Sequence, residues 1–86
     1  MSQEYYDNVK ARYPMDRLEE QFERIERLGY RVATSNDGCQ VWHMNDLIID
    51  ADFSNDFHEN AASMIHSFWE WAGRPMGPSA RTPGKG

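Results

Sequence analysis

The pattern of hydrophobic and polar positions predicts two helices in the first third of the chain. A short helix is expected over residues 3 to 12, with Ser2 as its N-cap. Pro14 separates it from the next helix, because proline disfavours helical geometry at the preceding residue and suits a first helical turn. Gly29 is expected to end the second helix in the left-handed conformation. That helix carries hydrophobic residues three and four positions apart: Met15, Leu18, Phe22, Ile25 and Leu28.

After Gly29 the hydrophobic pattern changes to alternation, which is typical of strands. Residues 30 to 34 alternate, Asn36-Asp37-Gly38 is a strong hairpin-turn signal, and residues 39 to 44 form a second strand. Asn45-Asp46 can supply another tight turn into a third strand over residues 47 to 53. The alternation therefore predicts a three-stranded antiparallel meander.

A final helix is predicted to begin at residue 54, 55 or 56 and to end at Gly73. Asp56 and Glu59 resemble a capping box, with Asp in place of the usual Ser or Thr. Trp69 and Trp71 flank an apolar face with regular helical spacing, which consists of Phe57, Ala61, Met64, Ile65, Phe68 and Ala72.

These elements predict a single α+β domain over residues 1 to 74, with residues 1 to 13 as a helical arm. Residues 75 to 86 are mainly Pro, Gly, Ser and basic residues, and we expect a disordered tail there. Both helices should pack on one face of the sheet. The inward set is then Tyr30, Val32, Cys39, Val41, Leu47, Ile49, Ala51 and Phe53. The outward set is Arg31, Ala33, Gln40, Trp42, Met44, Ile48, Asp50 and Asp52.

The outward set is unusual for a solvated sheet face, which normally carries Thr, Lys, Glu and Ser. It places Trp42, Met44 and Ile48 beside two carboxylates, an arrangement typical of a protein-binding surface. There are two other interpretations. Trp42 could be covered by the N-terminal segment, or the helices could lie on different faces of the sheet and make Trp42 part of the core.

Charge is distributed unevenly along the 86 residues, which have a formal net charge of −5. No Lys or Arg occurs from Val32 to Gly73, whereas seven Asp and Glu residues lie in that stretch. An acidic surface attracts basic partners. It disfavours direct binding to nucleic acid, because that binding needs Lys and Arg to displace counterions.

The sequence contains no recognisable catalytic or metal-binding signature, so we predict neither enzymatic activity nor a cofactor. Asp50 and Asp52 could hold a divalent cation or act as an acid/base pair, but local spacing fixes no third ligand. Cys39 is the single cysteine, which agrees with a reducing compartment. The histidines lack the spacing that places zinc ligands on one face: His43, His58 and His66.

We expect a cytoplasmic protein. No apolar run approaches the roughly 18 residues of a membrane span. The N-terminus also lacks the basic flank and the apolar stretch of a signal peptide.

The function predicted from these features is binding to a basic protein surface, which the domain would inhibit if that surface normally binds nucleic acid. The expected contact residues are Trp42, Met44, Asp46, Ile48, Asp50, Asp52, Asp56 and Glu59. One alternative is a homodimeric structural or regulatory accessory protein, with the Trp42 face or the hydrophobic seam of the second helix as the self-interface. Another is a small metal-dependent enzyme that uses Asp50 and Asp52.

In size, acidity and element order, residues 14 to 72 resemble small phage-encoded inhibitors of host defence, of the anti-CRISPR type. The resemblance includes the turn at Asn36-Asp37-Gly38 and the helix over residues 56 to 72, and it carries over no functional residue. It implies an inhibitor of a nucleic-acid-handling complex in the host cytoplasm.

Overall fold

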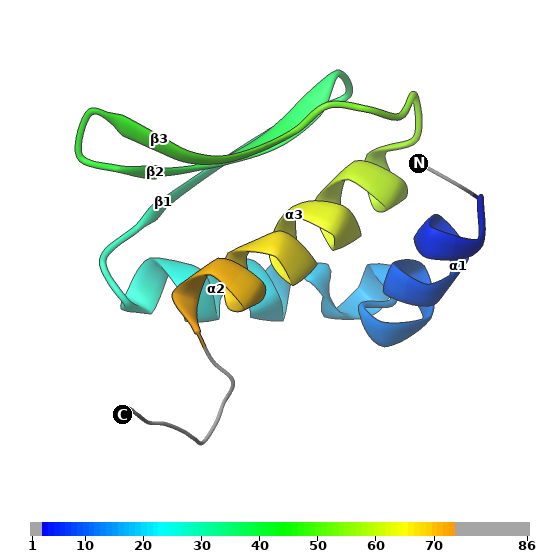
Figure 1. The fold of residues 1–86 in the computed structure, drawn as a ribbon. Helices are drawn as coiled ribbons and strands as arrows, with labels where there is room; N and C mark the ends of the chain where they lie inside the picture. The colour runs from blue at the N-terminus through cyan, green and yellow to red at the C-terminus, as the bar shows by residue number, and fades with distance from the viewer. Residues whose placement is uncertain (1–2, 74–86) are drawn as a thin grey trace.

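The computed structural model describes residues 3 to 73 (Figure 1). The predicted order of arm, helix, three strands and helix is confirmed. The Ser2 cap, residues 1 and 74 of the predicted domain, and the tail from residue 75 lie outside the described residues. The elements are α1 (Gln3–Arg12), the 3₁₀ turn η1 (Met15–Arg17), α2 (Leu18–Arg27), β1 (Arg31–Ser35), β2 (Gly38–His43), β3 (Asp46–Ala51) and α3 (Phe57–Ala72).

The helix ends form where local chemistry predicts them. Gly29 has a φ of +102° after α2, and Gly73 has a φ of +90° after α3. Both are in the left-handed region, which glycine enters without a steric penalty. Asp56 is the N-cap of α3, where its Oδ1 accepts a hydrogen bond from the Glu59 backbone N–H at 3.1 Å.

The three strands form one antiparallel sheet in the order β1-β2-β3, and the helices lie on one side of it (Figure 1). α3 packs against β2 and β3, α2 packs against β1 and α3, and α1 packs against α3. The predicted α+β class, with both main helices on the same face, is confirmed.

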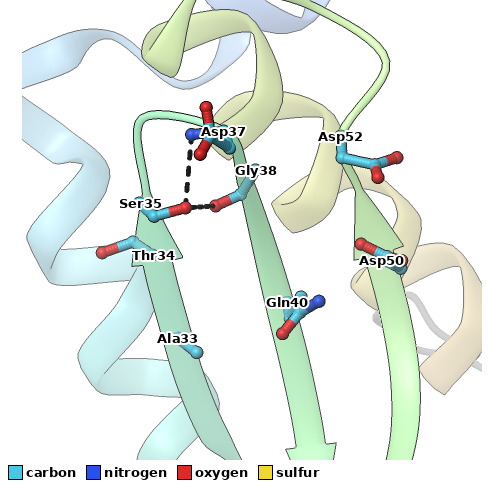
Figure 2. Close-up of a pocket in the computed structure, with 8 residues that line it drawn as sticks. All are labelled: Ala33, Thr34, Ser35, Asp37, Gly38, Gln40, Asp50 and Asp52. Atoms are coloured by element: carbon cyan, nitrogen blue, oxygen red, sulfur yellow. Dashed lines mark hydrogen bonds between the residues drawn. The ribbon is translucent and has the colours of Figure 1, made fainter.

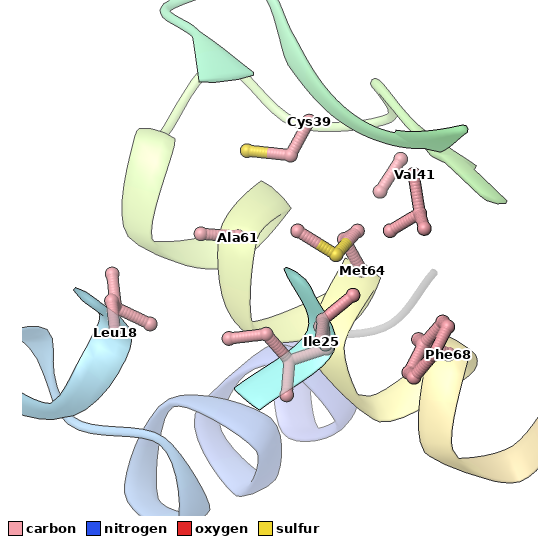
Figure 3. Packing of buried hydrophobic residues seen from close by; sticks show 9 residues of the cluster. Leu18, Ile25, Cys39, Val41, Ala61, Met64 and Phe68 are labelled. Atoms are coloured by element: carbon pink, nitrogen blue, oxygen red, sulfur yellow. The ribbon is translucent and has the colours of Figure 1, made fainter. Parts of the chain in front are cut away.

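The main core lies between the sheet and the two helices α2 and α3 (Figure 3). A second buried cluster joins α1 to the middle of α3 and consists of Tyr6, Val9 and Ala62. α3 contributes residues to both clusters, so it connects them. The buried residues of the main core are Leu18, Ile25, Cys39, Val41, Ala51, Ala61, Met64, Ile65 and Phe68.

Three helix positions that were predicted to be buried are exposed. Met15 lies in the 3₁₀ turn before α2, and Leu28 is the C-cap residue after it. Ala72 is the last residue of α3 and is also exposed. The prediction was wrong at these positions because each apolar stripe extends to the ends of its helix or just beyond them, where the core no longer covers it.

A β-bulge in β3 changes which residues face the helices. Val41 pairs with Ile49, but Trp42 pairs with Leu47, so Ile48 is the extra residue. Leu47 therefore lies opposite Trp42 and is 45% exposed, and its predicted inward orientation was wrong. One inserted residue has this effect because neighbouring side chains on a strand alternate between faces.

Two further strand-end predictions were wrong. β3 ends at Ala51, so strand alternation does not extend to Phe53, which is exposed instead of buried. The second turn consists of Met44 and Asn45, one position earlier than expected, because His43 pairs with Asp46. Met44 has a φ of +57° in this turn.

Candidate protein-interaction face of the sheet

We call the side of the sheet opposite the helices the outer face. No described element covers it (Figure 1). α1 packs against α3, and all three helices lie on the other side, so neither alternative placement of Trp42 is supported. The strand pairing places the following residues on the outer face: Arg31 beside Trp42, Ala33 beside Gln40, Gln40 beside Asp50, and Trp42 beside Leu47.

Trp42 is half-buried on the outer face because two neighbouring side chains contact it. Its Nε1–H donates a hydrogen bond to Gln40 Oε1 at 3.1 Å. The guanidinium carbon of Arg31 lies 5.4 Å from the ring centroid, within the range of a cation–π contact. Leu47 from β3 completes the apolar part of the face. The sequence placed Arg31 in the outward set, but only the strand register brings it onto the indole ring.

An acidic hollow of about 320 Å³ lies on the outer face, at the end near the β1–β2 turn (Figure 2). Three carboxylates contribute to it, from Asp37 in the turn, Asp50 in β3 and Asp52 after β3. Within residues 3 to 73 the lining contains no Lys, Arg or His, so these carboxylates define its charge. Its residues are Ala33, Thr34, Ser35, Asp37, Gly38, Gln40, Asp50 and Asp52.

Beside the hollow, the β1–β2 turn and the chain that follows β3 lie close to each other. Ser35 Oγ accepts from the Asp37 N–H and donates to the Gly38 carbonyl, both at 3.2 Å (Figure 2). A Cβ at Gly38 would lie only 2.8 Å from the Cβ of Asp52. Glycine at this position therefore lets the chain after β3 approach the turn, and it keeps Asp52 beside the hollow.

Asp37 belongs to this site although it was not among the expected contact residues. The hairpin signal at residues 36 to 38 placed it in a turn, and a meander brings that turn to the same end of the sheet as the end of β3. Combining these two predictions would have identified it. Gln40 joins the two parts of the site, since it lines the hollow and also binds Trp42.

Three expected contact residues lie near the opposite end of the sheet. Met44 is in the β2–β3 turn and is 82% exposed. Asp46 pairs with His43, and Ile48 is the half-buried bulge residue. Since the hollow is at the β1–β2 end, these residues do not contribute to it.

The remaining two expected residues, Asp56 and Glu59, stabilise the fold. Asp56 caps α3. The Glu59 side chain is only 12% exposed, and its Oε2 lies 3.3 Å from Lys10 Nζ. The hydrogen bond from Ser54 is the main cause that holds the pKa of Glu59 below its usual value, and Gln3 and Lys10 add to it. Glu59 is therefore charged but already paired within the domain.

Three features bear on the alternatives of an enzyme and a homodimer: possible metal ligands, the Cys39 thiol and the hydrophobic seam of α2. No group of three His, Cys, Asp or Glu side chains within residues 3 to 73 is arranged to hold a metal ion. Burial raises the pKa of the Cys39 thiol to about 11. Leu18 and Ile25 of the α2 seam are buried in the domain's own core, which removes them from any self-interface.

Within residues 3 to 73, none of the helices combines the length and the apolar character that crossing a membrane requires.

Comparison of the chain with protein-family models, curated proteins and solved structures found no match.

Proposed function

We propose that the outer face binds a basic surface of a protein partner. The observation that supports this most strongly is the acidic hollow beside Trp42 and Leu47, on a sheet face that no described element covers. Protein interfaces commonly combine an aromatic centre with charged groups around it.

Lys and Arg side chains suit this arrangement chemically. A guanidinium group donates several hydrogen bonds in a fixed plane, and carboxylates accept them in pairs. Asp50 and Asp52 lie two positions apart near the end of β3, and Asp37 lies across the hollow from them (Figure 2). A partner's basic side chain could therefore contact carboxylates from more than one segment while its aliphatic part lies against the sheet.

The proposed consequence is inhibition of a nucleic-acid-binding partner. Proteins bind phosphate backbones through clusters of Lys and Arg. A domain that occupies such a cluster with carboxylates competes with nucleic acid for the same groups. Opposite charges would also speed the encounter and make it sensitive to salt.

The experiment is capture of partners by the full chain from an extract of the source cells, at low and high salt, with mass spectrometry. The test variant is Asp50→Asn with Asp52→Asn, which removes two charges while keeping side-chain shape. The control is Asp16→Asn with Glu70→Gln, which makes the same charge change at two exposed positions away from the outer face. The proposal predicts a partner that the control retains and that both the test variant and high salt lose.

A second step tests inhibition. The captured partner is purified and bound to a labelled oligonucleotide, and unlabelled domain is added. Wild type should displace the oligonucleotide and the Asp50/Asp52 variant should not. Equal capture by wild type and the Asp50/Asp52 variant would refute binding through the hollow. Binding without displacement would refute the inhibitory role alone.

A further inference from the structure

A second hollow, of about 290 Å³, lies between β1 and α2, and we call it the edge groove. It is lined by residues of both elements: Glu19, Phe22, Glu23, Glu26, Val32 and Thr34. Phe22 and Val32 are half-buried and pack against the main core, so they supply an apolar floor. The groove is distinct from the outer face because α2 forms one of its walls.

β1 is an edge strand. The order of the sheet is β1-β2-β3, so one side of β1 pairs with β2 and no described strand pairs with the other (Figure 1). The backbone groups on an open edge can form hydrogen bonds with an added strand. An edge strand beside a helix is a suitable place for an extended peptide, because the strand supplies main-chain bonds and the helix contacts side chains.

The wall formed by α2 is acidic. Glu19, Glu23 and Glu26 are spaced four and three positions apart, which places them on one face of the helix. Glu23 forms a weak exposed ion pair with Arg27 at 3.8 Å. Among the described residues, Glu19 and Glu26 have no ion-pair partner, and the groove lining contains no basic residue.

We propose that the edge groove binds an extended basic segment of a protein partner, which adds to β1 as a fourth strand. Its main chain pairs with the open side of β1, its Lys or Arg side chains contact the glutamates of α2, and its apolar side chains lie on Phe22 and Val32. Charge complementarity and an apolar floor next to an open strand edge select this occupant.

Two other sites for strand addition fit less well. Pairing β1 with β1 of a second copy would bring the acidic walls of both copies together, which like-charge repulsion disfavours. At the opposite edge, β3 contains the bulge at Ile48, which interrupts its regular ladder.

The edge groove does not depend on the function proposed for the outer face, although the two surfaces adjoin. Thr34 lines both hollows. A single basic partner could therefore contact both surfaces along β1, but either contact can be tested without the other.

The test is an NMR titration of the isotopically labelled full chain with a short, end-capped peptide in which every second residue is alternately arginine or valine and the residues between are threonine, so that arginine and valine share one face of the added strand. Peptide binding should shift resonances of β1 and of the acidic wall of α2. The variant Glu19→Gln, Glu23→Gln, Glu26→Gln should bind about tenfold more weakly at low salt. The control Glu20→Gln, on the same helix but outside the groove lining, should bind as wild type does.

A second peptide identifies strand addition. Methylation of every backbone nitrogen removes the hydrogen-bond donors from both edges of the peptide while keeping every charge, and it should abolish binding. Equal binding of the methylated peptide would overturn strand addition. If the peptide shifted only the resonances of Asp50 and Asp52, and the Glu19/Glu23/Glu26 variant bound it as tightly as wild type, the edge groove would not be the binding site.

The tail of this chain is the competing occupant, because it contains Arg81 and Lys85. In a variant with both changed to Glu, groove resonances should stay unchanged without peptide. A shift there, together with tighter peptide binding, would show that the tail fills the groove and would overturn the proposal.

Discussion

Asn60 shows how a single buried polar side chain can connect two segments. It is 1% exposed, and its side-chain amide forms hydrogen bonds with both the backbone N–H and the backbone carbonyl of Ser54. Its Oδ1 accepts from the Ser54 N–H at 3.1 Å, and its Nδ2 donates to the Ser54 carbonyl at 2.8 Å. The connection from β3 to α3 is thereby held against the start of the helix.

Replacing Asn60 with Ala should lower the free energy of unfolding by about 2 kcal/mol, because two backbone groups lose their partner and a cavity forms. Urea denaturation followed by circular dichroism measures this loss. Asn8→Ala, at an exposed position of α1, is the control and should change the free energy of unfolding by less than about 0.5 kcal/mol. Equal effects of the two substitutions would contradict the role given to the Asn60 amide.

Met44 is an exposed residue in a conformation that disfavours its own side chain. Its φ of +57° is in the left-handed region, which costs a residue with a Cβ about 1 kcal/mol relative to glycine. Met44→Gly should therefore raise the free energy of unfolding by about 1 kcal/mol. Met44→Ala keeps the Cβ and should give no such gain. Thermal denaturation of both variants separates backbone strain from loss of the exposed methionine.

At the scale of elements, the junction of α1 with α3 depends on a charged residue. Glu59 in α3 binds Lys10 of α1 and Ser54 of the preceding loop. Tyr5 Oη also lies 3.0 Å from Ser63 Oγ. α1 is a short helix that would be marginal alone, so such contacts and the second buried cluster hold it in place.

This junction should make stability pH-dependent. The pKa of Glu59 is lower in the folded state than its ordinary value of 4.5, so the unfolded state binds the proton more readily. Its stabilising contribution is complete above that ordinary value and is lost as the pH falls through the folded pKa. Glu59→Gln should thus be less stable than wild type at neutral pH, and the difference should shrink in acid. Urea denaturation of wild type and Glu59→Gln across this range tests it, and a stability difference that stays constant with pH would contradict it.

At the scale of the whole molecule, Cys39 reports on opening of the core. The side chain is fully buried between the sheet and α3 (Figure 3), and burial raises the pKa of its thiol to about 11. Because the thiolate is the reactive form, the native protein protects the cysteine in two ways: burial keeps reagents away, and the raised pKa keeps the thiol protonated.

Labelling of Cys39 by a thiol reagent should be at least about 10³-fold slower in native buffer than in denaturant, because modification requires opening of the core. Asn60→Ala should accelerate native labelling by about 30-fold, the factor that corresponds to a loss of about 2 kcal/mol in the free energy of unfolding. A native rate that does not change with added urea would show that a local opening exposes the thiol instead.

The order of elements and the helix ends follow from the sequence because their causes are local. Pro14, Gly29 and Asp56 act on the residues beside them, and hydrophobic periodicity distinguishes helix from strand within one segment. The same local information identified the outward position of Trp42, and of Asp50 and Asp52 near the end of β3.

Only the tertiary structure decided how these residues are combined. The bulge at Ile48 depends on pairing between β2 and β3, and it turns Leu47 to the outer face. The contact of Arg31 with Trp42 depends on the β1–β2 register. The ion pair of Glu59 with Lys10 depends on α1 folding back onto α3. Contacts between segments far apart in the chain leave no fixed spacing in the sequence, so local patterns alone could not predict them.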